Sequence, residues 1–499
     1  MIEKIPQQTI QETHADESPN STLLEIAVKA FLENQPFSIN AVIEDCRWSE
    51  TMMSIEKAID NWKELLAVNL LSFLCSNQSK EMTAKICSFE RQVWDHDSQY
   101  FRVLVALNHW LAKMSVPEMG IHLLDNGAAL IDLHEYCPLL AIPYIPYHLE
   151  FGIFLALSIL LTKQEEGKGD LVRLAKWQLN TLDSNYRPLH ALFVRESDGD
   201  YLHNLRLYFL FFRGVAQLTG EKEFECASQA LNLLLIKEAS FIPAHPLWTL
   251  IEKVFSAPLI DKNACFPSFP LPEYVYDPST SLVGYRSEQQ HAICTLHGAN
   301  TGLGSFRWED IEIFNYGPQY LPLENCQGFG IEGNYLSDHG LRKPAIELKR
   351  NGFILRGCAR LVDEPSLSPF QIGKFRGIWL EVVQEFKQPC LNLSASFLGL
   401  DGWEDTAFSF FVKAEKCHVG SVITLLPGTL ERFEGHAFSL RLAGEKSSVH
   451  LNISNFNGTL QIIPLEGKQN FWGANFLISY IMNPDQRHYQ WEIIPGSNN

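Results

Sequence analysis

Two patterns of apolar positions divide the chain. From residue 21 to about residue 256, apolar side chains recur every three or four positions, as in Leu24, Ala27, Val28 and Phe31. This spacing gathers apolar side chains on one face of a helix. Similar stripes follow over residues 55–74, 82–94, 101–114, 119–133, 148–162, 171–182, 202–218 and 223–235. Gly and Pro separate them, which predicts helical hairpins that stack as a solenoid or close into an incomplete α/α toroid.

The pattern changes after a proline-rich stretch. Pro267, Pro270, Pro272 and Pro278 lie close together, which predicts a stiff linker over residues 261–280. Beyond it, short alternating or β-branched runs lie between turn residues. These runs cover residues 352–361, 377–386, 390–398, 408–412, 421–426, 448–453, 460–464 and 471–482. Many short strands without long helices predict an antiparallel β-sandwich.

The predicted organisation is therefore multidomain, α and then β. A helical, toroid-like domain covers residues 21–260, and an antiparallel β-sandwich covers residues 281–499. Residues 1–20 are polar, which predicts a disordered N-terminus. The length of 499 residues supports two domains, because a single core of that size is unusual.

Composition narrows the function. With 46% hydrophobic and 20% charged residues, the chain has the composition of a globular protein. Its formal net charge is −18, so nothing favours a nucleic-acid binder. A highly anionic glycan would also be repelled at long range unless the protein has a local basic cleft.

Cysteine usage and the N-terminus bear on the compartment. The 11 cysteines are scattered and none forms a Cys-x-x-Cys pair, which favours free thiols in a reducing compartment. The first 20 residues lack the basic-then-apolar layout of a signal peptide. The most apolar stretch, residues 149–161, is shorter than the roughly 20 residues that span a bilayer. We therefore expect a cytoplasmic protein without a transmembrane segment, with export by a signal-less route left open.

A glycine-rich segment separates two strand-like runs of the C-terminal half. It covers residues 297–306 and contains His297 and Asn300 beside three glycines. Glycine lets the backbone adopt a positive φ or approach another group closely. Two interpretations follow: a hairpin corner with a satisfied polar residue, or a strand end that holds a His and an Asn for chemistry.

Two helix starts in the N-terminal half also carry polar groups. His148 follows Tyr147 and precedes an apolar helix. An Asp198-Gly199 turn leads into a helix that begins with Tyr201 and His203. Capping or packing is the simpler interpretation of such residues, because polar side chains satisfy helix ends routinely.

The segment over residues 297–306 resembles the signature of heparinase II/III-type polysaccharide lyases. His297, Asn300 and the run Leu303-Gly304-Ser305-Phe306 fit that signature. Ala299 stands where the signature has a second His, and Thr301-Gly302 stand where it has an Asp. The resemblance implies a helical toroid followed by a β-sandwich, which is the order predicted above.

The same family contributes residues from two helix starts of its toroid. Its Asn-His pair is matched by Tyr147-His148, with Tyr in place of Asn. Its Tyr-His pair after an Asp-Gly turn is matched by Tyr201 and His203, without the intervening Glu and Ser of the pattern. Closing strands of the family's sandwich resemble residues 464–467 and 471–478.

The resemblance implies β-elimination on a uronic acid within a glycan. A base removes the C5 proton after the carboxylate is neutralised, and an acid protonates the leaving oxygen. Tyr201 or His203 would be the base, with His148 and His297 as further catalytic candidates. The candidate substrate contacts are Asn300, Arg206, Arg307, Trp308 and Tyr316. Solvated charge explains the two Arg equally well, and core or edge packing explains the aromatic residues.

We expect no metal and no other cofactor. The zinc-holding relatives use the second His of the signature and an Asp near the end of the next strand. Here Ala299 occupies the first place, and no Asp lies near Gly317-Pro318. Zinc requires three or four N, S or carboxylate ligands, and these positions do not supply them.

Two functional hypotheses remain. The first is a polysaccharide lyase, and the presence of Tyr201, His203 and His297 together favours it. The second is a catalytically degenerate scaffold of the same fold that binds carbohydrate or protein. The lost signature residues and the absent secretion signal favour this hypothesis. A purely structural helical-repeat protein leaves the segment over residues 297–306 unexplained.

Overall fold

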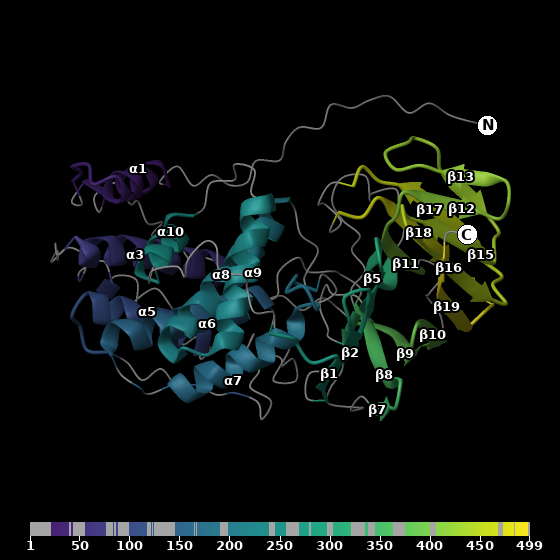
Figure 1. The fold of residues 1–499 in the computed structure, drawn as a ribbon, viewed down its shortest axis with the longest axis horizontal. Helices are drawn as coiled ribbons and strands as arrows, with labels where there is room; N and C mark the ends of the chain where they lie inside the picture. Colours follow the sequence, from purple (N-terminus) through teal and green to yellow (C-terminus); the bar gives the residue numbers. More distant parts are fainter. Residues whose placement is uncertain are drawn as a thin grey trace. The chain divides into compact units, whose positions relative to one another are not determined.

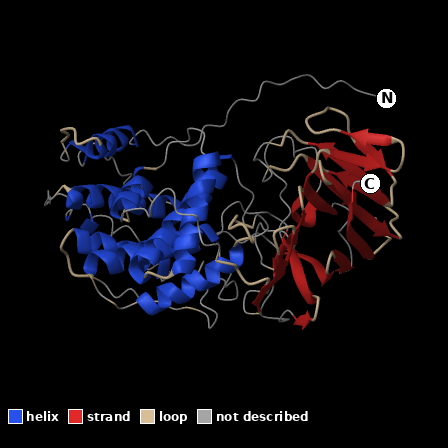
Figure 2. Cartoon of the chain, viewed as in Figure 1, coloured by secondary structure: helices blue, strands red, loops and turns tan. Residues whose placement is uncertain are grey.

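The computed structural model describes most of the predicted helices and strands. The described residues are 21–38, 41–42, 55–75, 83, 86–87, 99–116, 121, 123, 145–163, 165, 167–189, 198–238, 245–255, 269–278, 281–296, 303–320, 335–337, 345–362, 375–399, 406–467, 473–483 and 485–497. Helices occupy the N-terminal half and strands the C-terminal part (Figures 1 and 2). The predicted order of a helical part followed by a β-sandwich is therefore confirmed. The predicted disordered N-terminus and half of the predicted linker, residues 261–268 and 279–280, lie outside the described residues.

The chain divides into two compact units, and the division does not follow the predicted domain boundary. Unit 1 comprises Met1–His96, Leu104–Pro117 and Ala244–Val254. Unit 2 comprises Asp97–Val103, Glu118–Pro243 and Phe255–Asn499. Several of the helices thus cluster with the β-sandwich in one unit.

Unit 1 is a small helical core. It contains α1 (Ser21–Leu32), α3 (Ile55–Leu74), the later part of α5 (Gln99–Leu111) and α10 (Pro246–Val254). Trp62, Leu65 and Leu104 are fully buried in it. One polar pair lies inside this core: Asn69 Nδ2 donates to Asn108 Oδ1 at 2.9 Å. Asn108 Nδ2 in turn donates to the carbonyl of Leu104 at 3.1 Å. Both buried amides thus have partners, which offsets the cost of burying them.

The helices of unit 2 pack closely. They are α6 (Ile145–Thr162), α7 (Lys168–Gln178), the 3-10 helix η1 (Leu179–Thr181), α8 (Asp198–Thr219) and α9 (Lys222–Glu238). Helix α6 packs on α8, and α8 packs on α9. At the α6–α8 contact, a Cβ added to Gly152 would lie 2.2 Å from Cε2 of Phe211. The absence of a side chain at Gly152 therefore permits the approach of these helices.

The strands form two antiparallel sheets. The first has the order β1 (Tyr274–Asp277), β2 (Leu282–Arg286), β3 (Gln290–Cys294), β4 (Gly304–Trp308), β5 (Ile311–Tyr320), β11 (Thr406–Lys413), β18 (Phe476–Ile481), β17 (Thr459–Pro464) and β14 (Phe433–Gly435). The second has the order β13 (Ile423–Leu425), β12 (Lys416–Val419), β15 (Ser439–Ala443), β16 (Ser447–Ser454), β19 (His488–Ser497), β10 (Cys390–Leu398), β9 (Phe375–Lys387), β8 (Gly352–Val362) and β6 (Tyr335–Ser337), and β7 (Ala345–Lys349) pairs with β8. Strand β1 lies within the stretch predicted to be a linker.

One apolar core joins the two sheets. Residues of the first sheet such as Phe306 and Phe408 meet residues of the second such as Leu393 and Trp491. The rings of Phe408 and Trp491 stack with centroids 4.2 Å apart. Because side chains alternate along a strand, the intervening residues of β2 to β5 lie on the opposite face of the first sheet. That outer face carries the polar groups described next.

Candidate functional site

His148, one of the predicted catalytic residues, lies in the core of the unit 2 helices. Its side chain is fully buried, and its ring packs on Trp177 with centroids 4.6 Å apart. Burial lowers the pKa of His148 to about 3, against the opposing effect of a hydrogen bond with Gln178. The imidazole is therefore neutral at physiological pH and is not at the protein surface. This position corrects the expectation that His148 reaches a substrate: it is a packing group at the start of α6.

The start of α8 holds the predicted Tyr201 and His203. Both residues belong to the helix, and the side chain of Tyr201 lies outside the described structure. The His203 side chain is 40% exposed, and Arg206, one turn later, is partly exposed. His203 therefore combines a helix-fixed backbone with access to solvent, as a proton-transfer residue requires.

A buried carboxylate faces His203. Glu150 on α6 is 3% exposed, and its Oε1 lies 3.8 Å from Nε2 of His203. The hydroxyl of Tyr100 donates to Glu150 Oε2 at 2.5 Å. Tyr100 is itself 1% exposed and packs against Phe154 of α6. Three elements thus bring Tyr100, Glu150 and His203 together, and only His203 was predicted from the sequence.

Polar residues also form a row across the outer face of the first sheet. Arg286 on β2 pairs with His291 on β3, and His291 pairs with Arg307 on β4. Arg307 in turn pairs with Glu312 on β5, and Glu312 with Lys413 on β11. Directly opposed residues on one face of a sheet interact, so this row alternates cations with a His and a carboxylate.

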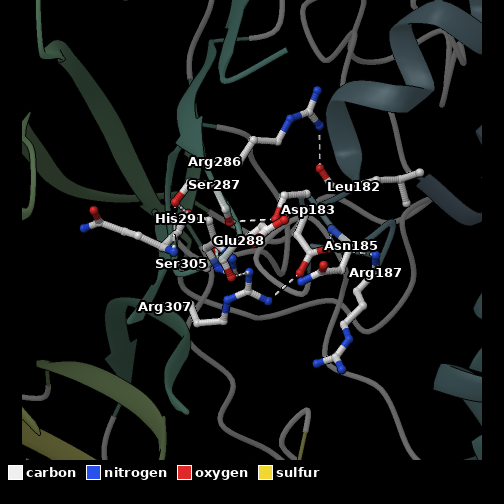
Figure 3. A network of polar contacts seen from close by, with 12 residues as sticks. Leu182, Asp183, Asn185, Arg187, Arg286, Ser287, Glu288, His291, Ser305 and Arg307 are labelled. Atoms are coloured by element: carbon white, nitrogen blue, oxygen red, sulfur yellow. Dashed lines mark hydrogen bonds and ion pairs between the residues drawn. The ribbon is translucent and has the colours of Figure 1, made fainter. Parts of the chain in front are cut away.

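The row contacts the loop that follows η1, as Figure 3 shows. Arg307 Nη1 donates to Asp183 Oδ2 at 2.5 Å. Arg286 Nη1 donates to the carbonyl oxygens of Leu179 and Leu182. Ser184 Oγ donates to the carbonyl of Ser287 at 2.6 Å. These contacts join η1 and the loop after it to β2, to the turn between β2 and β3, and to β4 within unit 2.

The predicted role of Arg307 needs correction for this reason. The expectation was that Arg307 contacts a substrate carboxylate, but the carboxylate that it binds belongs to Asp183. Arg307 is 6% exposed, so the pair is shielded from water. Two backbone N–H groups, those of Asn185 and Arg187, donate to Asp183 Oδ1. A substrate carboxylate would have to displace a fully hydrogen-bonded aspartate.

Glu312 is the carboxylate of the row and lies between Arg307 and Lys413. Burial raises the pKa of its carboxyl and the nearby Asp183 adds to the rise, while Arg307, Lys413 and Arg187 oppose it. The net direction is upward, so desolvation outweighs the three cations. Glu312 was not predicted as a functional residue.

The two aromatic candidates occupy different positions. Tyr316 is 1% exposed within the sandwich core, and its hydroxyl donates to Gln384 Oε1 at 2.7 Å. Its ring therefore does not offer a surface on which a sugar could stack, which corrects that expectation. Trp308, at the end of β4, is partly exposed and packs against the edge of the same core. Trp308 is therefore not fully enclosed by the core.

The glycine-rich segment joins two paired strands. His297 and Asn300, together with residues 298, 299, 301 and 302, lie outside the described residues. On either side, Thr295 N donates to the carbonyl of Leu303, and Cys294 pairs with Gly304. The segment is thus the connection of the β3–β4 hairpin, and the catalytic role of His297 stays a prediction.

The rest of the signature run is explained by packing. Leu303 and Phe306 are buried in the sandwich core. A Cβ on Gly304 would lie 2.2 Å from the carbonyl oxygen of Ile293 and 2.4 Å from the hydroxyl of Tyr316. Ser305, on the outer face, lies with its Oγ 3.3 Å from Nε2 of His291. These four residues thus have packing roles within the β3–β4 hairpin.

Sequence reasoning missed Asp183, Glu150 and Tyr100. Asp183 had one local signal, because Asp-x-Asn is a sequence in which an Asp side chain accepts its neighbours' N–H groups. Arg286 and His291 had another: each adjoins a mostly apolar run, residues 282–285 and 292–296. Within the described part of the chain, no group of three or more His, Cys, Asp or Glu is placed to hold a metal ion.

Comparison with known proteins adds little to this geometry. No protein-family model and no curated protein matches the sequence. Among solved structures, the chain is similar to a heparinase III with methylated lysines, at a TM-score of 0.45 and 10% identity over 94% of this chain and 71% of that chain. It is also similar to a 4-α-glucanotransferase from Thermococcus litoralis, at a TM-score of 0.26 and 10% identity over 70% of this chain and 49% of that chain. Neither likeness identifies a family for this chain.

Proposed function

We propose that the protein is a heparinase II/III-like polysaccharide lyase that cleaves uronic-acid-containing glycans by β-elimination. One observation carries the proposal: a solvent-accessible His203 lies beside a buried, hydrogen-bonded carboxylate, two residues after Tyr201 on the same helix. A base held by a third group is the usual arrangement of proton-transfer sites. The resemblance of residues 297–306 to the family signature supports the same function.

In this proposal, Tyr201 and His203 share the proton transfers. His203 takes the C5 proton, the electrons of that C–H bond form the C4=C5 double bond, and the C4–O bond breaks. Tyr201 donates its hydroxyl proton to the leaving glycosidic oxygen and regains a proton from His203. The charge that develops on the uronate carboxylate requires a donor. His297, Asn300 and Arg206 are the candidates for it, since Arg307 is held by Asp183.

The expected ligand is a polysaccharide or oligosaccharide, with Trp308 as a stacking surface. An aromatic ring packs against the apolar face of a sugar. No helix in the described residues is long and apolar enough to cross a membrane.

The test measures the ultraviolet absorbance of the C4=C5 double bond conjugated to the carboxylate. Purified protein is incubated with a panel of uronic-acid polymers, beside the variants Tyr201→Phe and His203→Gln. We expect product from the wild type and a loss of about 100-fold or more in each variant. An exposed His488→Gln variant is the matched control and should keep full activity. Equal product from all four proteins would show that the activity resides elsewhere.

A second candidate is a catalytically degenerate scaffold of the same fold that binds carbohydrate or protein. The burial of His148 and Tyr316 and the occupation of Arg307 by Asp183 favour it, because three predicted contributors do not face a ligand. Silence on every polymer by folded wild type, together with glycan binding that Trp308→Ala weakens, would support this alternative.

A further inference from the structure

The carboxylate of Glu150 is divided between two partners. Oε2 accepts the hydroxyl hydrogen of Tyr100 at 2.5 Å, and Oε1 faces His203 Nε2 at 3.8 Å. The first distance is that of a short hydrogen bond. The second is an ion-pair distance, longer than a hydrogen bond. The carboxylate is therefore anchored on one side and directed at the imidazole on the other.

The anchor is rigid. Tyr100 is 1% exposed, and its ring packs on Phe154 with centroids 5.9 Å apart. Phe154 lies one helical turn after Glu150 on α6, so the same helix supports both the carboxylate and the ring that fixes it. A side chain held in this way loses little further entropy when it acts on a partner.

The two histidines near Glu150 differ in their exposure to solvent. His148 is fully buried, neutral and packed on Trp177, whereas the His203 side chain is 40% exposed. Only His203 combines access to solvent with a carboxylate at its ring. A buried carboxylate stabilises the cation that an imidazole becomes when it takes a proton, and it fixes which ring nitrogen is turned inward.

We propose that Glu150, anchored by Tyr100, is a positioning residue that turns the Nε2 edge of His203 inward and stabilises the imidazolium formed during β-elimination. The inference rests on the proposed function. The Nδ1 atom of His203 then exchanges the proton with the substrate. Tyr100 acts through Glu150, whose carboxylate it anchors.

A variant series tests this assignment. Glu150→Gln keeps the size of the side chain and an oxygen for Tyr100 but removes the charge. We expect kcat to fall about 10–100-fold with KM changed less than about threefold, because the charge acts on a state formed during the reaction. Tyr100→Phe should give a smaller fall of about 3–10-fold, since the carboxylate remains but is less fixed. Glu150→Asp should recover part of the activity that Glu150→Gln loses.

A double-mutant comparison of Glu150 and His203 separates a positioning role from a general structural effect. In a His203→Gln background, Glu150→Gln should cost less than about twofold, because the group that it serves is already gone. Ser158→Ala is the matched control: Ser158 is a buried residue two turns further along α6, and its loss should leave kcat unchanged. Equal effects of Glu150→Gln in both backgrounds would overturn the proposal.

A readout that needs no turnover distinguishes failure of this inference from failure of the proposed function. In ¹H–¹⁵N spectra of the imidazole rings, assigned with His203→Gln, the His203 signals should move in Glu150→Gln and stay in place in Ser158→Ala. Unmoved His203 signals overturn the inference even if the enzyme is active. Wild type without any lyase product overturns the proposed function, and with it the catalytic purpose of the pair, even if the signals move.

Discussion

The Nη1 atom of Arg307 lies 2.5 Å from Oδ2 of Asp183, which joins strand β4 to the loop after η1. Their side chains are 7% and 3% exposed. Arg286 reinforces the junction through its bonds to the carbonyls of Leu179 and Leu182. The outer face of the first sheet thus contacts the helical segment at this place.

Removing one partner of that pair should destabilise the protein strongly. Asp183→Ala leaves the Arg307 guanidinium buried without its carboxylate and frees two backbone N–H groups. We expect a loss of about 3–5 kcal/mol in the free energy of unfolding. Urea denaturation followed by far-ultraviolet circular dichroism measures it.

The exposed pair of Asp170 and Arg173 provides the control. Their atoms lie 3.2 Å apart, and both side chains are well exposed. Asp170→Asn should therefore change stability by less than about 1 kcal/mol. A similar cost for Asp183→Ala and Asp170→Asn would contradict the importance of burial at Asp183.

His148 should make stability depend on pH. Its pKa falls from 6.5 to about 3 because burial disfavours the charged form. Between these values the unfolded chain binds a proton that the native state does not, so stability falls as pH falls, by about 1.4 kcal/mol per unit. His148→Gln should remove this slope. Urea midpoints between pH 6.5 and about 5, above the main carboxylate titrations, measure it, and an unchanged slope argues against a neutral, buried His148.

Gly304 should not tolerate a side chain. A Cβ there would meet the Ile293 carbonyl oxygen, a backbone atom that cannot move aside. Gly304→Ala should cost about 1–3 kcal/mol or more. Gly169 on α7 is the matched control, since nothing lies within 4 Å of its added Cβ. Gly169→Ala should stabilise the protein by about 0.5–1 kcal/mol. Thermal melts of both variants decide the comparison.

Substitutions at Tyr316 and Trp308 should have different effects, on stability at Tyr316 and on glycan affinity at Trp308. Tyr316→Phe removes the hydroxyl that donates to Gln384 and should cost about 1 kcal/mol, without any effect on glycan affinity. Trp308→Ala should reduce glycan affinity by about 10-fold if a sugar stacks there. Isothermal calorimetry with the best polymer fragment measures the glycan affinity of both variants. A loss of affinity in Tyr316→Phe would mean that its ring reaches the ligand after all.

Strand prediction succeeded where alternation was regular. The residues predicted for β10, 390–398, are those of the strand, because buried apolar and less buried polar residues alternate over residues 391–397. It missed β12 over residues 416–419, because the one strand predicted here, over residues 421–426, contains only β13. The structure has β12 and then β13, joined by a turn at Gly420 with a φ of 60°. A single glycine in a polar run did not reveal that turn.

The sequence by itself determined the order of a helical part and a sandwich, since that order depends on the period of the apolar positions. It also singled out His203, because a polar group at a helix start is a local feature. Only the tertiary structure decided which histidine faces a carboxylate. Glu150 lies 50 residues from Tyr100 along the chain, and their contact exists only once α5 and α6 have packed. Asp183 and Arg307 lie 124 residues apart. Burial and pairing of charges over such separations depend on packing, which a pattern of residue types does not encode locally.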